Sequence, residues 1–249
     1  MADEGECPCA ICKNHHEFNL DNFLLDEIRA ENVAIFAGSG ISTESPNIAP
    51  HSLYLELAHQ AALDNVQMSS PDVAQAIADK PDGRFHLMRT VQERFDYINK
   101  FRDLRAMATS FYRELATMPY FNTFITTNWD RYFEEYCAAK PFVYDADMRF
   151  WGVPRRKVLK VHGTIDDYSS IVATRSDYKK CGSRLQKSLV GAKLKEILAT
   201  NTCLFIGYSL RETTTLERFF RSSKKHWGNF IRRTTLFHPK PRALHFPST

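Results

Sequence analysis

Four short apolar runs along the chain are each followed by small polar residues. The runs are rich in β-branched and aromatic residues and are bounded by turn-forming residues, which is typical of buried parallel strands. They occupy residues 33–36, 124–125, 158–161 and 204–206. In an open α/β sheet, ligands bind at the carboxyl ends of the strands. We therefore expect the polar residues that follow the four runs to meet at one edge of a sheet.

A helical repeat dominates much of the remaining chain. Residues 20–29 predict an amphipathic helix that leads into the first strand. Between residues 51 and 118 no run predicts a strand, and helical periodicity recurs around 54–62, 73–78, 85–101 and 107–115. We expect Ser70 to cap one of these helices, with Pro71 at its first position. This stretch predicts a helical insertion after the first strand, placed to cover a ligand as a lid.

Further elements complete the predicted fold. We expect additional strands at residues 142–144 and 171–173, and helices at about 185–198 and 212–220. Together the elements predict an α/β fold, with a Rossmann-like parallel sheet, helices on both faces and a helical insertion at about 51–118. We expect residues 1–29 to form a cysteine-rich tail and a leading helix, and residues 30–249 to form one domain.

The composition fits a globular protein of one domain. The chain has 249 residues, of which 43% are hydrophobic and 25% are charged, and such a chain can bury one sizeable core. The first fifteen residues contain no apolar stretch of the kind found in signal peptides. No segment approaches the roughly 18 consecutive apolar residues of a membrane-spanning helix. We therefore expect a soluble, cytoplasmic protein.

Positive charge is concentrated towards the C-terminus. The net charge is only +4, but residues 211–242 contain nine Lys or Arg against two Glu, and residues 155–157 form another basic cluster. Such a face attracts nucleic acid or an acidic partner, and it is also common on solvated surfaces. Because the sequence has no binding motif in which aromatic and basic residues alternate, a nucleic-acid partner stays open but is not indicated.

The six cysteines fall into two groups. The scattered ones are expected to be reduced thiols of the core or the surface, and they are Cys137, Cys181 and Cys203. The others stand close together near the N-terminus, before His15 and His16. Thiolates and one imidazole complete a tetrahedral zinc site, so the candidate ligands are Cys7, Cys9, Cys12 and His15. The alternative is a tail with free thiols, because the usual structural zinc pattern has two Cys-x-x-Cys pairs farther apart.

The polar residues after the four strands form an ordered set. First comes the glycine-rich loop Ala37-Gly38-Ser39-Gly40-Ile41-Ser42, and then Thr126-Thr127-Asn128-Trp129-Asp130. The set continues with His162-Gly163 and ends with Gly207-Tyr208-Ser209. In this order the motifs resemble the sirtuin family of NAD-consuming enzymes, over roughly residues 30–220. The resemblance implies that residues 30–249 form an NAD-binding catalytic domain.

The glycine-rich loop is suited to bind a pyrophosphate. Gly38 and Gly40 permit a tight turn and a close approach of the backbone, so that N–H groups and the hydroxyls of Ser39 and Ser42 can face the phosphates. The loop lacks the third glycine and the later acidic residue of the dehydrogenase fingerprint, which disfavours hydride transfer. The resemblance implies that the residues in contact with NAD are Gly38, Ser39, Gly40, Ser42, Thr43, Thr127, Asp130, Gly207, Tyr208 and Ser209.

Asn128 and His162 are the candidate catalytic residues. The Asn128 amide can orient a water beside the nicotinamide ribose, and its carbonyl oxygen can stabilise an oxocarbenium-like transition state. His162 ends a strand, which leaves its imidazole free to contact ribose hydroxyls, and a near-neutral pKa suits a general base. The resemblance implies these roles, and it implies that Asp130 contacts the nicotinamide carboxamide. A second interpretation is that Asn128 caps the helix that contains Tyr132.

The segment after His162 separates two activities. Deacylating sirtuins carry paired Cys-x-x-Cys motifs there, whereas this chain has only Cys181 and Cys203 before Gly207. Residues 161–167, 171–178 and 205–210 instead resemble the sirtuin-like domains of bacterial antiphage defence. This resemblance implies an NAD+ glycohydrolase that releases nicotinamide and ADP-ribose in antiviral defence, as a homo-oligomer or with a sensor protein. The alternatives are an NAD-dependent deacylase or ADP-ribosyltransferase, and a catalytically silent NAD-sensing or interaction module.

Overall fold

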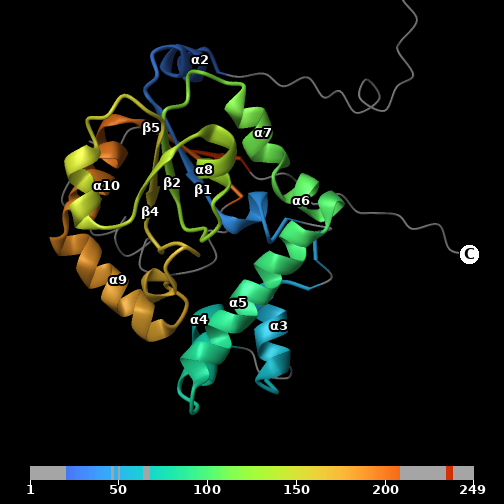
Figure 1. The fold of residues 1–249 in the computed structure, drawn as a ribbon. Helices are drawn as coiled ribbons and strands as arrows, with labels where there is room; N and C mark the ends of the chain where they lie inside the picture. The colour runs from blue at the N-terminus through green and yellow to red at the C-terminus, as the bar shows by residue number, and fades with distance from the viewer. Residues whose placement is uncertain (1–20, 46–47, 50, 64–67, 208–233, 238–249) are drawn as a thin grey trace, which may run out of the picture.

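A six-stranded sheet forms the centre of the structure (Figure 1). The computed structural model describes residues 21–45, 48–49, 51–63, 68–207 and 234–237. The strand order is β3-β4-β2-β1-β5-β6, and every neighbouring pair is parallel. The strands are β1 (Val33–Ala37), β2 (Thr123–Thr126), β3 (Lys140–Phe142), β4 (Lys157–Lys160), β5 (Thr202–Ile206) and β6 (Thr234–Phe237). Because β1, β2, β4 and β5 overlap the four apolar runs, the predicted Rossmann-like parallel sheet is confirmed.

Alternate residues of the strands pack into two cores, one on each face of the sheet. In β1, Ile35 belongs to the first core and Phe36 to the second. The first core is closed by the helices α2 (Asn22–Arg29), α7 (Ser110–Ala116) and α8 (Tyr132–Cys137). The second is closed by α9 (Arg175–Lys187) and α10 (Leu189–Thr200), which lie on the other side of the sheet in Figure 1. Helices therefore cover both faces, as the sequence predicts.

The described chain between β1 and β2 is helical and contains no strand, which confirms the predicted insertion. Its helices are α3 (Leu53–Gln60), α4 (Ser70–Ala78), α5 (Gly83–Lys100), α6 (Arg102–Ala108) and α7. The helices α3, α4 and α5 lie together at the bottom of Figure 1 and pack around a third core that includes Leu57, Met88 and Phe95. Leu55 and Phe85 stay 51% and 66% exposed. Within the described ranges, no helix combines the length and the apolar character that crossing a membrane requires.

Several predicted boundaries differ from the structure. α4 begins at Ser70, so Ser69 holds the capping position and Pro71 is not the first helical residue. The helix expected at 107–115 is divided at Thr109, and the one expected at 185–198 is divided at Ser188, which caps α10. β3 begins two residues earlier than the strand expected at 142–144. Short 3-10 helices occur at Ser39–Ile41, Asp145–Phe150 and Tyr168–Ser170.

Residues 171–173 form no strand, so that expectation is wrong. The Val172 N–H donates to the His162 carbonyl at 3.0 Å, and the chain then enters α9 directly. The Asp177 carboxylate accepts from the N–H groups of Ala173 and Thr174, while the Thr174 hydroxyl accepts from the Asp177 N–H. This capping box uses backbone donors that a strand would offer to its neighbour. The helix expected at 212–220 lies outside the described residues.

The loops after β1 and β5 approach each other more closely than side chains would allow. The Gly40 N–H donates to the Gly207 carbonyl at 3.0 Å. A Cβ on Gly40 would lie 2.8 Å from that oxygen. Gly207 has φ +61°, a left-handed conformation that favours glycine. These two glycines let the carboxyl ends of neighbouring strands close against each other.

Gly40→Ala should lower the free energy of unfolding by about 1–3 kcal/mol, because its Cβ would force the two loops apart. Chemical denaturation measures this loss. Gly152→Ala is the matched control, since a Cβ at Gly152 meets no atom within 4 Å. Equal stability of the two variants would contradict the close approach of the loops.

Candidate active site

A cavity of about 200 Å³ lies at the carboxyl ends of β1, β2 and β4. Its walls come from the loops that follow these strands, from α9, and from the helices α3, α4 and α5 of the insertion. The insertion contributes Leu53, Tyr54, Leu57, Ser70, Ala74, Arg94 and Phe95. The insertion therefore covers the strand ends, in the position expected of a lid.

The structure brings six of the predicted catalytic and NAD-contacting residues to this cavity. Its lining includes Ser39, Thr43, Thr127, Asn128, Asp130 and His162. Gly38 and Ser42 contact Asn128, and Gly40 contacts Gly207. The described residues do not include Tyr208, Ser209, or the cluster Cys7, Cys9, Cys12 and His15. Within the described part of the chain, no group of His, Cys, Asp or Glu side chains is arranged to hold a metal.

The Asn128 side chain is buried and held by its amide nitrogen. Nδ2 lies 3.1 Å from the Gly38 carbonyl, 3.2 Å from Ser42 Oγ and 3.3 Å from Tyr112 Oη. Because the carbonyl can only accept, the nitrogen must face the glycine-rich loop. Asn128 Oδ1 has no hydrogen-bond partner among the described residues. The amide is thus fixed with its oxygen available as an acceptor.

Asp130, rather than Asn128, accepts a hydrogen bond at the start of α8. Its Oδ1 accepts from the Tyr132 N–H at 3.2 Å, so the capping interpretation of Asn128 does not hold. The Asp130 side chain is buried, and burial raises its pKa to about 6, although the Lys160 charge and the Tyr132 N–H lower it. Asp130 can therefore change its charge close to neutral pH.

His162 follows β4 and is buried at the same cavity. Its ring meets the Tyr178 ring edge-on, with 5.0 Å between the centroids. Burial and the nearby Arg184 guanidinium lower the pKa of His162 to about 3, whereas the sequence suggested a near-neutral value. Nε2 has no hydrogen-bond partner within the described structure. The imidazole is therefore neutral at physiological pH, and Nε2 can accept a hydrogen bond.

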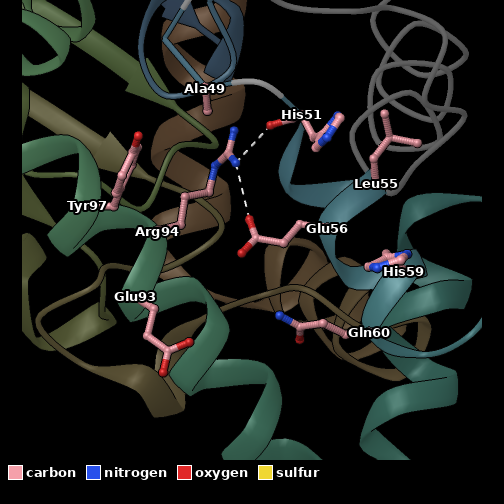
Figure 2. A pocket seen from close by; sticks show the side chains of 9 residues that line it. All are labelled: Ala49, His51, Leu55, Glu56, His59, Gln60, Glu93, Arg94 and Tyr97. Atoms are coloured by element: carbon pink, nitrogen blue, oxygen red, sulfur yellow. Dashed lines mark hydrogen bonds and ion pairs between the residues drawn. The ribbon is translucent and has the colours of Figure 1, made fainter.

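Arg94 of α5 joins the insertion to Thr43 and Glu44, directly after the glycine-rich loop. Its guanidinium donates to the Thr43 carbonyl at 3.2 Å and to Glu44 Oε1 at 2.8 Å. It also donates to the His51 carbonyl at 3.0 Å and to Glu56 Oε2 at 3.3 Å, as Figure 2 shows. Figure 2 shows a second cavity, of about 740 Å³, whose lining contains none of the predicted site residues. Because Arg94 lines both cavities, it is part of the wall between them.

The sequence profile of the SIR2-like domain matches residues 122–248, more than half of the chain. The chain belongs to the SIR2-like domain family. It is 31% identical to NAD(+) hydrolase ThsA of Cytobacillus dafuensis over 195 residues, which are 76% of this chain and 37% of that protein. NAD(+) hydrolase ThsA of Bacillus cereus (strain MSX-D12) is 27% identical over 193 residues, 75% of this chain and 39% of that protein. The protein of the same name from Enterococcus faecium is 28% identical over 200 residues, which are 78% of this chain and 40% of that protein. The chain spans about two fifths of the length of these curated relatives.

Sequence reasoning missed three residues that shape the site of this SIR2-like domain. Trp129 lines the cavity, and its Nε1 has no partner among the described residues. Arg94 and Lys160 are buried charged side chains. Arg94 lies on the same face of α5 as Val91, and Lys160 interrupts the apolar run of β4. For Arg94 and Lys160, the sequence does contain a signal: each is a charged residue at a position where the hydrophobic periodicity predicts burial.

Arg94→Met should destabilise this SIR2-like domain by about 3 kcal/mol, because Glu44 would keep a largely buried carboxylate without its cation. Adding Glu44→Gln to that variant should recover part of the loss, as a double-mutant cycle by chemical denaturation would show. Arg89→Met is the matched control on the same helix, because the Arg89–Glu93 pair is exposed. If Arg94→Met and Arg89→Met were equally well tolerated, the anchoring role of Arg94 would be wrong.

Proposed function

We propose that this SIR2-like domain is an NAD+ glycohydrolase, which cleaves the bond between nicotinamide and ribose with water. The observation that carries the proposal is a pair of buried acceptors on one cavity. Asn128 Oδ1 and His162 Nε2 have no partner within the described residues, and they follow the neighbouring strands β2 and β4. Because buried polar atoms are normally hydrogen-bonded, both atoms are suited to bind polar groups of a substrate. The relatives named NAD(+) hydrolase add support.

Each polar side chain has a distinct part in the proposed reaction. Asn128 is held by its nitrogen, so its oxygen can face the positive charge that develops at the ribose C1′ or orient the attacking water. The neutral His162 imidazole accepts a hydrogen bond from a ribose hydroxyl or from that water and so orients it. Asp130 accepts a hydrogen bond from the nicotinamide carboxamide. The C1′–N bond breaks with its electron pair on nicotinamide, the water oxygen bonds to C1′, and the water proton is released.

The size of the cavity suits the reacting end of NAD. Its volume is about 200 Å³, while sites that enclose a drug-sized ligand measure roughly 300–1,000 Å³. We therefore assign the cavity to nicotinamide and its ribose. The pyrophosphate then lies along the loop of Gly38, Ser39 and Gly40, where a 3-10 helix begins at Ser39.

The cysteines favour hydrolysis over deacylation. Cys181 and Cys203 are buried in the core between the sheet and the helices α9 and α10. Burial raises the pKa of both thiols, that of Cys203 to about 12, so they stay protonated and are poor zinc ligands. Incubation with NAD alone separates the alternatives. Hydrolysis needs no acceptor, deacylation needs an acyl-lysine peptide, ADP-ribosyl transfer needs a nucleophile other than water, and a sensing module binds NAD without turnover.

Asn128→Ala and His162→Ala should each lower nicotinamide release from NAD by about 10²-fold or more, because each removes a positioned catalytic group. Chromatography of the released nicotinamide measures the rate, and circular dichroism checks the fold. Asn122→Ala and His86→Ala are the matched controls, since neither residue lines the cavity. Turnover at the wild-type rate in both folded site variants would refute the assignment.

We extend the proposal to the physiological role and the assembly. The resemblance to antiphage-defence domains implies that NAD depletion serves antiviral defence. An NAD hydrolase that is always active would harm its own cell, so we propose that activity requires a homo-oligomer or a sensor partner. The insertion covers the cavity and exposes Leu55 and Phe85, which makes it the element suited to couple assembly to the cleft.

Activity and oligomer mass should fall together when the protein is diluted, because a site completed by assembly is lost with the assembly. Mass photometry alongside NAD turnover tests this expectation. Phe85→Asp should weaken association, whereas Leu189→Asp should not, since Leu189 is equally accessible but lies on α10, away from the insertion. Full turnover by a species shown to be monomeric would defeat the assembly proposal and leave the catalytic one standing.

A further inference from the structure

Lys160 is a fully buried lysine at the base of the candidate site. It lies in β4, two residues before His162, and the exposed fraction of its side chain is 0%. Lysine is almost never buried to this extent unless it is paired. Its Nζ lies 2.9 Å from Glu134 Oε1 and 3.5 Å from the Trp129 carbonyl, and it also donates to the Asp130 carbonyl.

The acceptors of Lys160 all belong to the segment 129–134, which joins β2 to α8. This segment follows Asn128 directly and carries Asp130. Hydrogen bonds from a charged donor are roughly twice as strong as neutral ones, and a buried environment strengthens them further. Neither Lys160 nor Glu134 lines the cavity. The backbone that presents the two site residues is therefore anchored to β4 by a charge behind it.

Titratable and charged groups act on Asp130 from several elements. Those that interact with it are Lys160 on β4, Tyr132 and Glu134 on α8 and Tyr112 on α7, while His162, Arg94 and Glu44 line the same cavity. Arg94 is already paired with Glu44. The Lys160 ammonium and the Glu134 carboxylate are the two charged groups that act on Asp130 with opposite sign.

We propose that Lys160 and Glu134 are positioning residues for the reaction at this site: their buried ion pair holds the turn at residues 128–130 against β4 and sets the charge that Asp130 presents to the nicotinamide carboxamide. The inference rests on the proposed NAD hydrolysis. Both residues act through the turn and through Asp130.

The two members of the pair act on Asp130 in opposite directions. Burial raises the pKa of Asp130 to about 6, the Lys160 charge lowers it, and the Glu134 charge raises it. Without the Lys160 charge, Asp130 should keep its proton up to a higher pH. Without the Glu134 charge, it should ionise at a lower pH. Loss of a merely structural contact would not produce two shifts of opposite sign.

The experiment compares Lys160→Met with Glu134→Gln in the full chain. Nicotinamide release from NAD is followed against pH, and the titration of the Asp130 carboxyl is followed by ¹³C NMR, with Asp130→Asn to assign its signal. The acid limb of the rate profile and the Asp130 titration should both move to higher pH in Lys160→Met and to lower pH in Glu134→Gln. Met matches the length of the lysine side chain without its charge.

The exposed pair Arg131–Asp166 provides matched controls. Arg131 is adjacent to Asp130 in sequence, and both partners of this pair are about half exposed. Solvent screens such charges, so Arg131→Met and Asp166→Asn should leave the profile and the titration where they are in the wild type. If Lys160→Met does not fold, Glu134→Gln is compared with the double variant Lys160→Met/Glu134→Gln. Removal of the Lys160 charge should then move the Asp130 titration to higher pH in the double variant than in Glu134→Gln.

The outcomes separate this inference from the proposed function. Shifts of the same sign in both variants, or an unchanged Asp130 titration, would overturn the positioning role. Opposite shifts in the NMR titration with no nicotinamide release by the wild type would refute NAD hydrolysis, while the control of Asp130 by the ion pair would stand. Opposite shifts in both measurements support the two together.

Discussion

The cost of burying polar groups at the ends of parallel strands governs this structure. The sheet brings the loops after β1, β2 and β4 to one edge, and the insertion then covers that edge. A buried polar atom without a partner is costly, so most of the polar groups here are bonded to one another. The Asn128 nitrogen is satisfied by the glycine-rich loop. Asn128 Oδ1 and His162 Nε2 are among the buried atoms without a partner within the described residues, and they mark where a substrate would supply the missing partners.

Two buried cations secure the two loops that carry the site. Arg94 reaches from the insertion to the backbone of Thr43, and Lys160 reaches from β4 to the backbone that follows Asn128. Each cation is paired with a carboxylate, which offsets the cost of burying it. Lys160 belongs to the sheet and should stay fixed. Arg94 belongs to the insertion, so a movement of α5 would be transmitted directly to the glycine-rich loop.

The sequence predicted the features that have a local cause. β-Branched runs followed by glycine or small polar residues marked the strands, and parallel strand ends necessarily share an edge, so Asn128 and His162 were expected on one cavity. The strand expected at 171–173 has the right composition, but the capping box of Asp177 draws this segment into the start of α9. The Arg94–Glu44 pair joins residues 50 positions apart. Such pairing is decided by tertiary packing, which periodicity does not encode.

Two titratable side chains on the cavity, Asp130 and His162, have opposite effects on stability. Between pH 4 and pH 6 the native state keeps a proton on Asp130 that the unfolded chain releases, so this group lowers stability as pH rises. Native His162 stays neutral in that range, while the unfolded chain binds an additional proton on this imidazole, so His162 raises stability as pH rises. Each slope approaches about 1.4 kcal/mol per pH unit, and they oppose each other. The contributions of Asp130 and His162 to the pH dependence of stability therefore partly cancel, and titration of the Asp130 carboxyl itself reports its change of charge directly.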